Sequence, residues 1–109
     1  MDKAGNKLIV TIVGKGKAGR VIDAAHHAGA TGATVLGGHG AAVQLFLGIS
    51  VDPEKDVVFT IIEEEKAHAV LEAISREMEL EHPHKGLAFM ISLDRVIGMH
   101  KSGDGDDSY

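Results

Sequence analysis

With 109 residues the chain has room for one domain with a single core, and its lack of cysteine excludes disulfides, thiolate metal sites and thiol nucleophiles. The formal net charge of −5 and the absence of tryptophan disfavour nucleic acid as a partner, because an acidic surface repels the phosphate backbone. The apolar stretches are too short to span a bilayer and the chain opens on a polar segment, so we expect a cytoplasmic protein with no signal peptide and no direct membrane insertion.

The first half of the chain predicts a strand, a helix and a second strand. The β-branched run at residues 8–13 is typical of a strand. A helix is predicted over residues 17–28, because apolar side chains recur there at helical spacing and Gly29 supplies a stop. A second short strand is predicted at residues 33–36, and residues 41–55 then form a connecting loop.

The second half predicts a strand, a longer helix and a last strand. Residues 57–62 form the third strand, and a helix opens on three glutamates from Glu63, because acidic side chains suit the positive end of a helix dipole. The core stripe of this helix lies at helical spacing: Ala67, Val70, Leu71, Ile74 and Met78. Residues 87–91 form the fourth strand. We expect a single domain with its core over about residues 7–100, followed by a disordered acidic tail at residues 101–109.

The order β-α-β-β-α-β is the ferredoxin-like arrangement, an α+β sandwich in which two helices cover one face of an antiparallel sheet. Three of the four predicted strands are apolar on both faces, whereas a sheet with one wet face alternates apolar with polar residues. Two helices can cover only one face, so the other would expose an apolar patch. We therefore expect self-association through the open sheet face. The alternative is a monomer with a crowded apolar surface.

Two loops carry candidate binding residues. Gly38, His39 and Gly40 follow the second strand, and glycines allow a backbone to approach a ligand closely. Lys85 and Gly86 lie in the loop before the last strand. In an oligomer these loops could meet across a subunit boundary and cradle an anion or a phosphate. The alternative is that the glycines only form turns.

Other motifs do not assemble into a site. Residues 14–20 join a strand to a helix but lack the spacing of phosphate-binding glycine loops, which favours a turn followed by a solvated basic helix start. Among the seven histidines, His26 and His27 point about 100° apart on a helix, and His82 and His84 lack a third ligand, so no metal site is predicted. No serine is paired with a base, and we expect a protein that is not an enzyme.

The chain resembles the P-II nitrogen-regulator family over about residues 7–101. The order of elements and several short motifs carry the resemblance: Gly-Ala-Thr-Val at 32–35, Gly-His-Gly at 38–40, the helix pattern at 66–74, Lys-Gly-Leu-Ala-Phe at 85–89 and Leu-Asp-Arg-Val at 93–96. The resemblance implies a homotrimer that binds an adenine nucleotide, such as ADP, AMP, ATP or a cyclic nucleotide, in the clefts between subunits. The expected nucleotide-binding residues are Gly38, His39, Gly40, Lys85, Gly86 and His100.

The family signals through a long loop after the second strand, which docks on transporters, enzymes or transcription factors. In this chain the loop at 41–55 is shorter and strongly apolar. We expect it to bind a partner such as a membrane transporter or a metabolic enzyme, or else to pack on the trimer. The side chains concerned are Val43, Leu45, Phe46, Leu47 and Ile49.

Several positions depart from the family pattern. Ala41 and Ala42 stand where the archetypal proteins have arginine and glutamine, Leu87 replaces a phosphate-binding lysine, and Gly98 replaces an arginine. A nucleotide with fewer phosphates than ATP would demand fewer cationic contacts. Two alternatives share the fold: a trimeric metal-binding protein resembling the CutA cation-tolerance proteins, and a small enzyme such as an isomerase or a monooxygenase.

Overall fold

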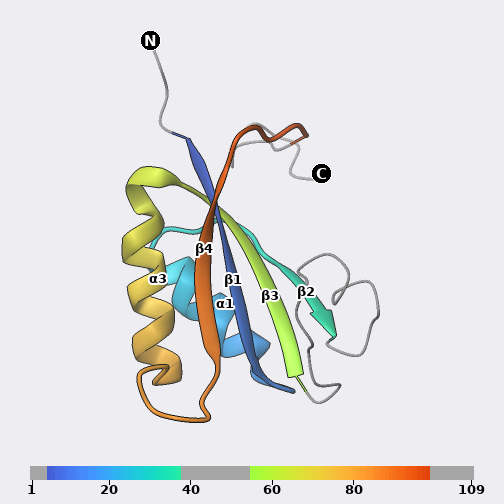
Figure 1. The fold of residues 1–109 in the computed structure, drawn as a ribbon, viewed down its shortest axis with the longest axis vertical. Helices are drawn as coiled ribbons and strands as arrows, with labels where there is room; N and C mark the ends of the chain where they lie inside the picture. Colours follow the sequence, from blue (N-terminus) through green and yellow to red (C-terminus); the bar gives the residue numbers. More distant parts are fainter. Residues whose placement is uncertain (1–4, 38–54, 99–109) are drawn as a thin grey trace.

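The computed structural model describes residues 5–37 and 55–98, and these contain two helices and four strands in the predicted order. The elements are β1 (Asn6–Gly14), α1 (Ala18–His27), β2 (Thr34–Gly37), β3 (Lys55–Glu63), α3 (Glu64–Met78) and β4 (Leu87–Leu93) (Figure 1). The central strands run longer than predicted because their ends also pair, Asn6 with Glu63 and Gly14 with Lys55. The α+β class is confirmed.

The four strands form one antiparallel sheet in the order β2-β3-β1-β4. In the register of this sheet, Ile9 of β1 lies opposite Thr60 of β3 and Met90 of β4, while Val35 of β2 lies opposite Val58 of β3. Both helices lie on the same face of the sheet (Figure 1). Strands β2 and β4 are therefore the two edges, and the other face carries no helix among the described residues.

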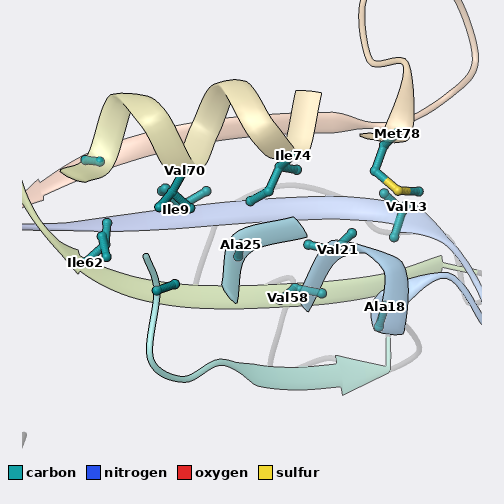
Figure 2. Packing of buried hydrophobic residues seen from close by; sticks show 12 residues of the cluster. Ile9, Val13, Ala18, Val21, Ala25, Val58, Ile62, Val70, Ile74 and Met78 are labelled. Atoms are coloured by element: carbon teal, nitrogen blue, oxygen red, sulfur yellow. The ribbon is translucent and has the colours of Figure 1, made fainter. Parts of the chain in front are cut away.

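The core between the helices and the sheet is built from small and β-branched side chains, which point toward one another in Figure 2. Each helix buries side chains three or four residues apart, so that one apolar stripe faces the sheet. The stripes meet the strands as one cluster: Ala18, Val21 and Ala25 of α1; Ala67, Val70, Ile74 and Met78 of α3; Ile9 and Val13 of β1; Val58 and Ile62 of β3. Thr11 and Thr60 are fully buried, and their hydroxyls have no hydrogen-bond partner in the part of the chain that the structure describes.

The face opposite the helices, called the open face below, is apolar across β3, β1 and β4. The register places its side chains in three rows: Ile61, Leu8 and Ile91; Phe59, Val10 and Phe89; Val57, Ile12 and Leu87. Leu8, Val10 and Val57 are buried among their neighbours, whereas Ile61, Leu87 and Ile91 are exposed. The predicted two-sided apolar pattern of the strands is thus confirmed.

Candidate functional site

The loop between α3 and β4, residues 79–86, is fixed firmly at its first end. Leu80 donates its N–H to the carbonyl of Ser75 at 3.0 Å, and Glu79 donates to the carbonyl of Arg76 at 3.3 Å. This pair of bonds is the Schellman pattern, which satisfies the last carbonyls of a helix. It requires a left-handed residue, and Glu79 takes that conformation with φ 56°. The loop therefore leaves α3 in one defined direction.

The second end of the 79–86 loop is held by Gly86, which lies against the backbone of β1. Gly86 has φ +138°, and a Cβ added to it would lie 2.7 Å from the carbonyl oxygen of Ile12. It would also lie 3.2 Å from side-chain atoms of Leu80 and Val13. Only glycine fits so close to a neighbouring strand in this conformation. The neighbouring Lys85 is exposed, and its Nζ lies 3.6 Å from Oε1 of Glu79.

A cavity of about 450 Å³ opens on the open face, toward the other end of β1 from Gly86. Three chain segments line it: Leu8, Phe59 and Ile61 from β1 and β3; Gly32, Ala33 and Thr34 at the start of β2; Val96, Ile97 and Gly98 after β4. None of these lining side chains is charged, and Thr34 supplies the one side-chain hydroxyl. Such a wall suits a flat, largely apolar ring better than a phosphate. No sequence motif assigned these residues to a site.

The two predicted site residues that the structure describes lie at one edge of the sheet, and the strand that leads to Gly38 lies at the other edge. Lys85 and Gly86 lie at the β4 edge, while β2, which leads to Gly38, ends at Gly37 on the other edge. Gly37 lies opposite Asp56, Asp56 lies opposite Val13, and Gly86 packs beside Val13, so both ends share one row across the sheet. Strands are spaced about 4.8 Å apart, which separates these ends by roughly 14 Å.

The remaining predicted residues lie outside the described part of the chain. They are the nucleotide-binding candidates Gly38, His39, Gly40 and His100, and the partner-loop residues Val43, Leu45, Phe46, Leu47 and Ile49. Their placement therefore stays a prediction.

The basic segment at residues 14–20 forms a turn that is tied to the sheet. The N–H of Gly16 donates to Oδ2 of Asp56 at 2.9 Å, and Arg20 binds Glu77 through Nε at 3.1 Å. Asp56 therefore anchors this turn to the start of β3, and Arg20 joins the start of α1 to the end of α3. These contacts are structural ones, as expected for a turn followed by a solvated helix start.

Neither a metal-binding cluster nor a catalytic pair forms within residues 5–37 and 55–98. No three His, Asp or Glu side chains gather there closely enough to hold a metal ion. Lys7 Nζ donates to Ser92 Oγ at 2.8 Å, but this pair is exposed. In the same ranges no helix is long and apolar enough to cross a membrane.

The family model described as "Nitrogen regulatory protein P-II" matches residues 6–102. The chain belongs to the P-II family. This match confirms the resemblance inferred over residues 7–101, and it makes the chain a relative of regulatory proteins. No curated protein matches the sequence.

Solved structures show the same fold at low sequence identity. A putative PII-like signalling protein from Thermus thermophilus aligns with a TM-score of 0.61 and 20% identity over 85% of this chain and 90% of that one. CPII from Thiomonas intermedia, a nitrogen regulatory PII-like protein bound to ADP, AMP and bicarbonate, aligns with a TM-score of 0.58 and 19% identity over 84% of this chain and 93% of that one. The B. subtilis GlnK–ATP complex aligns with a TM-score of 0.62 and 15% identity over 84% of this chain and 87% of that one.

Proposed function

We propose that this P-II family member is a homotrimeric signalling protein that binds an adenine nucleotide between subunits and regulates a partner protein. The observation that carries the proposal is that Lys85 and Gly86 lie at the β4 edge of the sheet, whereas β2, which leads to Gly38, ends at the opposite edge. Two strand ends roughly 14 Å apart in one chain are too far apart to hold the same phosphate group. Two protomers placed side by side would bring the β2 edge of one to the β4 edge of the next.

The assembly follows from the same geometry. When sheets meet edge to edge, twofold symmetry pairs like edges, whereas contacts between unlike edges build a ring if the rotation from one subunit to the next closes. The three apolar rows of the open face would then line the inside of the ring and be removed from solvent, which is favourable for an apolar surface of this extent. A ring of three agrees with what the family resemblance implies.

The chemistry of the candidate site supports an adenine nucleotide. Lys85 is exposed and offers an ammonium group to a phosphate. CPII and GlnK, which share the fold, have been solved with ADP and AMP and with ATP. The nucleotide-binding residues proposed are Gly38, His39, Gly40, Lys85, Gly86 and His100.

Calorimetry with AMP, ADP, ATP and cyclic AMP tests the binding proposal. The substitution Lys85→Met should weaken the binding of these nucleotides by about 1–3 kcal/mol, the usual contribution of a charge-assisted hydrogen bond. Lys66→Met is the matched control, because Lys66 is an exposed lysine in the first turn of α3. If none of the four nucleotides binds the wild-type chain, the proposed function is wrong. If the Lys85→Met variant binds them with unchanged affinity, only the assignment of Lys85 to the site is wrong.

The oligomer is tested by light scattering after size-exclusion chromatography. Ile91 projects from the open face and is 40% exposed in the single chain, so Ile91→Asp should place a charge in the subunit contact and release monomers. Ala69→Asp on the exposed surface of α3 is the control and should leave the mass unchanged. A monomer mass for the wild-type chain would contradict the assembly.

Regulation of a partner, such as a membrane transporter or a metabolic enzyme, is proposed for the apolar loop residues Val43, Leu45, Phe46, Leu47 and Ile49. A nucleotide bound at the root of this loop could select among loop conformations, and a partner would read that selection. Hydrogen exchange is the appropriate measurement. We expect fast exchange at residues 43–49 in the free trimer, and strong protection there would show that the loop packs on the trimer instead.

A further inference from the structure

Glu79 occupies a left-handed position at the end of α3 where glycine would be more stable. It is the left-handed residue that closes the Schellman pattern at the end of α3, with φ 56°. Glycine is the usual residue there, because a Cβ is unfavourable in this conformation. What the glutamate adds is a carboxylate, whose Oε1 lies 3.6 Å from Nζ of Lys85. A strained residue whose side chain reaches a candidate ligand group is a reason to look for a functional role.

The backbone of the 79–86 loop gives this ion pair a fixed frame. One end is tied by the bond from Leu80 to Ser75, and the other by the close approach of Gly86 to Ile12. Inside the loop, the backbone N–H of His82 donates to the carbonyl of Glu79 at 3.0 Å, and His84 is also left-handed with φ 65°. The two tied ends hold the backbone of Glu79 and Lys85 near each other, and a change of side-chain rotamers is enough to separate the ion pair.

The charges around the loop favour the ion pair over an incoming anion. Lys85 is the only lysine or arginine between residues 77 and 86, whereas Glu77, Glu79 and Glu81 all lie in this segment. Glu77 forms an ion pair with Arg20, in which Oε2 lies 3.1 Å from Nε. A smaller cavity of about 230 Å³ behind the loop has Glu72 and Glu81 in its wall and no cationic side chain. A phosphate that reaches Lys85 therefore meets one ammonium group that is already paired and carboxylates nearby.

We infer that Glu79 is a specificity-determining residue of the nucleotide site, which lowers affinity in proportion to the charge of the phosphate chain. The inference rests on the proposed function. A phosphate must displace the carboxylate of Glu79 from Lys85 and then bear its repulsion, which grows with phosphate charge. The loss of binding affinity caused by Glu79 is therefore smallest for AMP and cyclic AMP and largest for ATP. The site therefore prefers adenine nucleotides with a low phosphate charge.

The test is calorimetry with cyclic AMP, AMP, ADP and ATP on the full chain, for the wild type, Glu79→Gln, Lys85→Met and the double variant. Glutamine keeps the length of the side chain and removes its charge. Glu79→Gln should tighten ATP binding by roughly two- to fivefold, the range of an exposed ion pair, with a smaller gain for AMP and the smallest for cyclic AMP. The gain should shrink in high salt, because both side chains are about half exposed.

Two controls separate a specific role from a general one. Glu81→Gln removes a charge from the same loop, where no ion pair to Glu81 occurs among the described residues, so its effect should be smaller and less dependent on phosphate number. In the Lys85→Met background, Glu79→Gln should lose the part of its benefit that comes from releasing Lys85 and keep the part that rises with phosphate charge, whereas a merely structural effect on the loop would be the same in both backgrounds and for all four nucleotides.

The outcomes are distinct. A wild-type chain that binds none of the four nucleotides overturns the proposed function and this inference with it. A wild-type chain that binds them, combined with a Glu79→Gln variant whose affinities are all unchanged or all shifted by one factor, overturns the assignment of Glu79 alone. Tighter binding that increases from cyclic AMP to ATP supports it.

Discussion

Gly86→Ala should be among the most damaging small substitutions in the chain. The added Cβ would meet the carbonyl oxygen of Ile12 at 2.7 Å, and that carbonyl belongs to the central strand, which pairs on both sides. Forcing a methyl group into such a contact costs about 1–3 kcal/mol. The φ of +138° adds about 1–3 kcal/mol for a residue with a side chain. We expect a loss of about 2–6 kcal/mol, against a total stability of about 5–15 kcal/mol for a typical domain.

Two other glycines separate the contributions. Gly16 has φ +90° with open space around its Cβ position, so Gly16→Ala should cost the conformational part alone, about 1–3 kcal/mol. Gly19 lies inside α1, also in open space, so Gly19→Ala should stabilise by about 0.5–1 kcal/mol. Urea unfolding followed by circular dichroism, at one protein concentration, gives the three values. A Gly86→Ala variant no less stable than Gly16→Ala would refute the steric argument.

Two further predictions concern the core, and the same urea assay measures both. Thr60→Val should raise stability by about 1 kcal/mol, because it removes a buried hydroxyl that has no hydrogen-bond partner among the described residues and keeps the β-branched shape; a loss of stability would reveal a partner such as a bound water. Ile74→Ala should cost about 2–5 kcal/mol, because Ile74 is fully buried between α3 and the sheet; a cost below about 1 kcal/mol would mean that the helix is not packed as described.

The elements that could be predicted from the sequence are those with a local signal. The stripe from Ala67 to Met78 repeats at helical spacing, and the helix follows it almost to the residue. The family motifs likewise led to Lys85 and Gly86, which the structure places together in the 79–86 loop. The strands with apolar residues on both faces also predicted the apolar open face. A strand such as β1 that is buried on both faces needs apolar residues at successive positions, and this pattern is visible in the sequence.

The features that escaped prediction depend on contacts between distant segments. The 450 Å³ cavity is formed by residues 32–34 and 96–98 together with Leu8, Phe59 and Ile61, and no local sequence pattern predicts that these segments meet. The left-handed Glu79 runs against the preference for glycine at a helix end, so the sequence carries no sign of the turn there. The family resemblance predicts Gly86 as a nucleotide-binding residue, but it does not predict the close approach of Gly86 to Ile12, which depends on the register of β1 with β4.

The position of β1 in the middle of the sheet has a consequence for how the chain folds. Its two partners come late in the sequence: Asn6 pairs with Glu63 of β3 and with Leu93 of β4. Both pairings close long loops, and such non-local contacts slow folding because the entropy of closure is lost before the contacts form. During synthesis β1 leaves the ribosome first and β4 last among these strands. The apolar run of β1 therefore has no partner until β3 has emerged, and its second side stays unpaired and prone to aggregation until β4 follows.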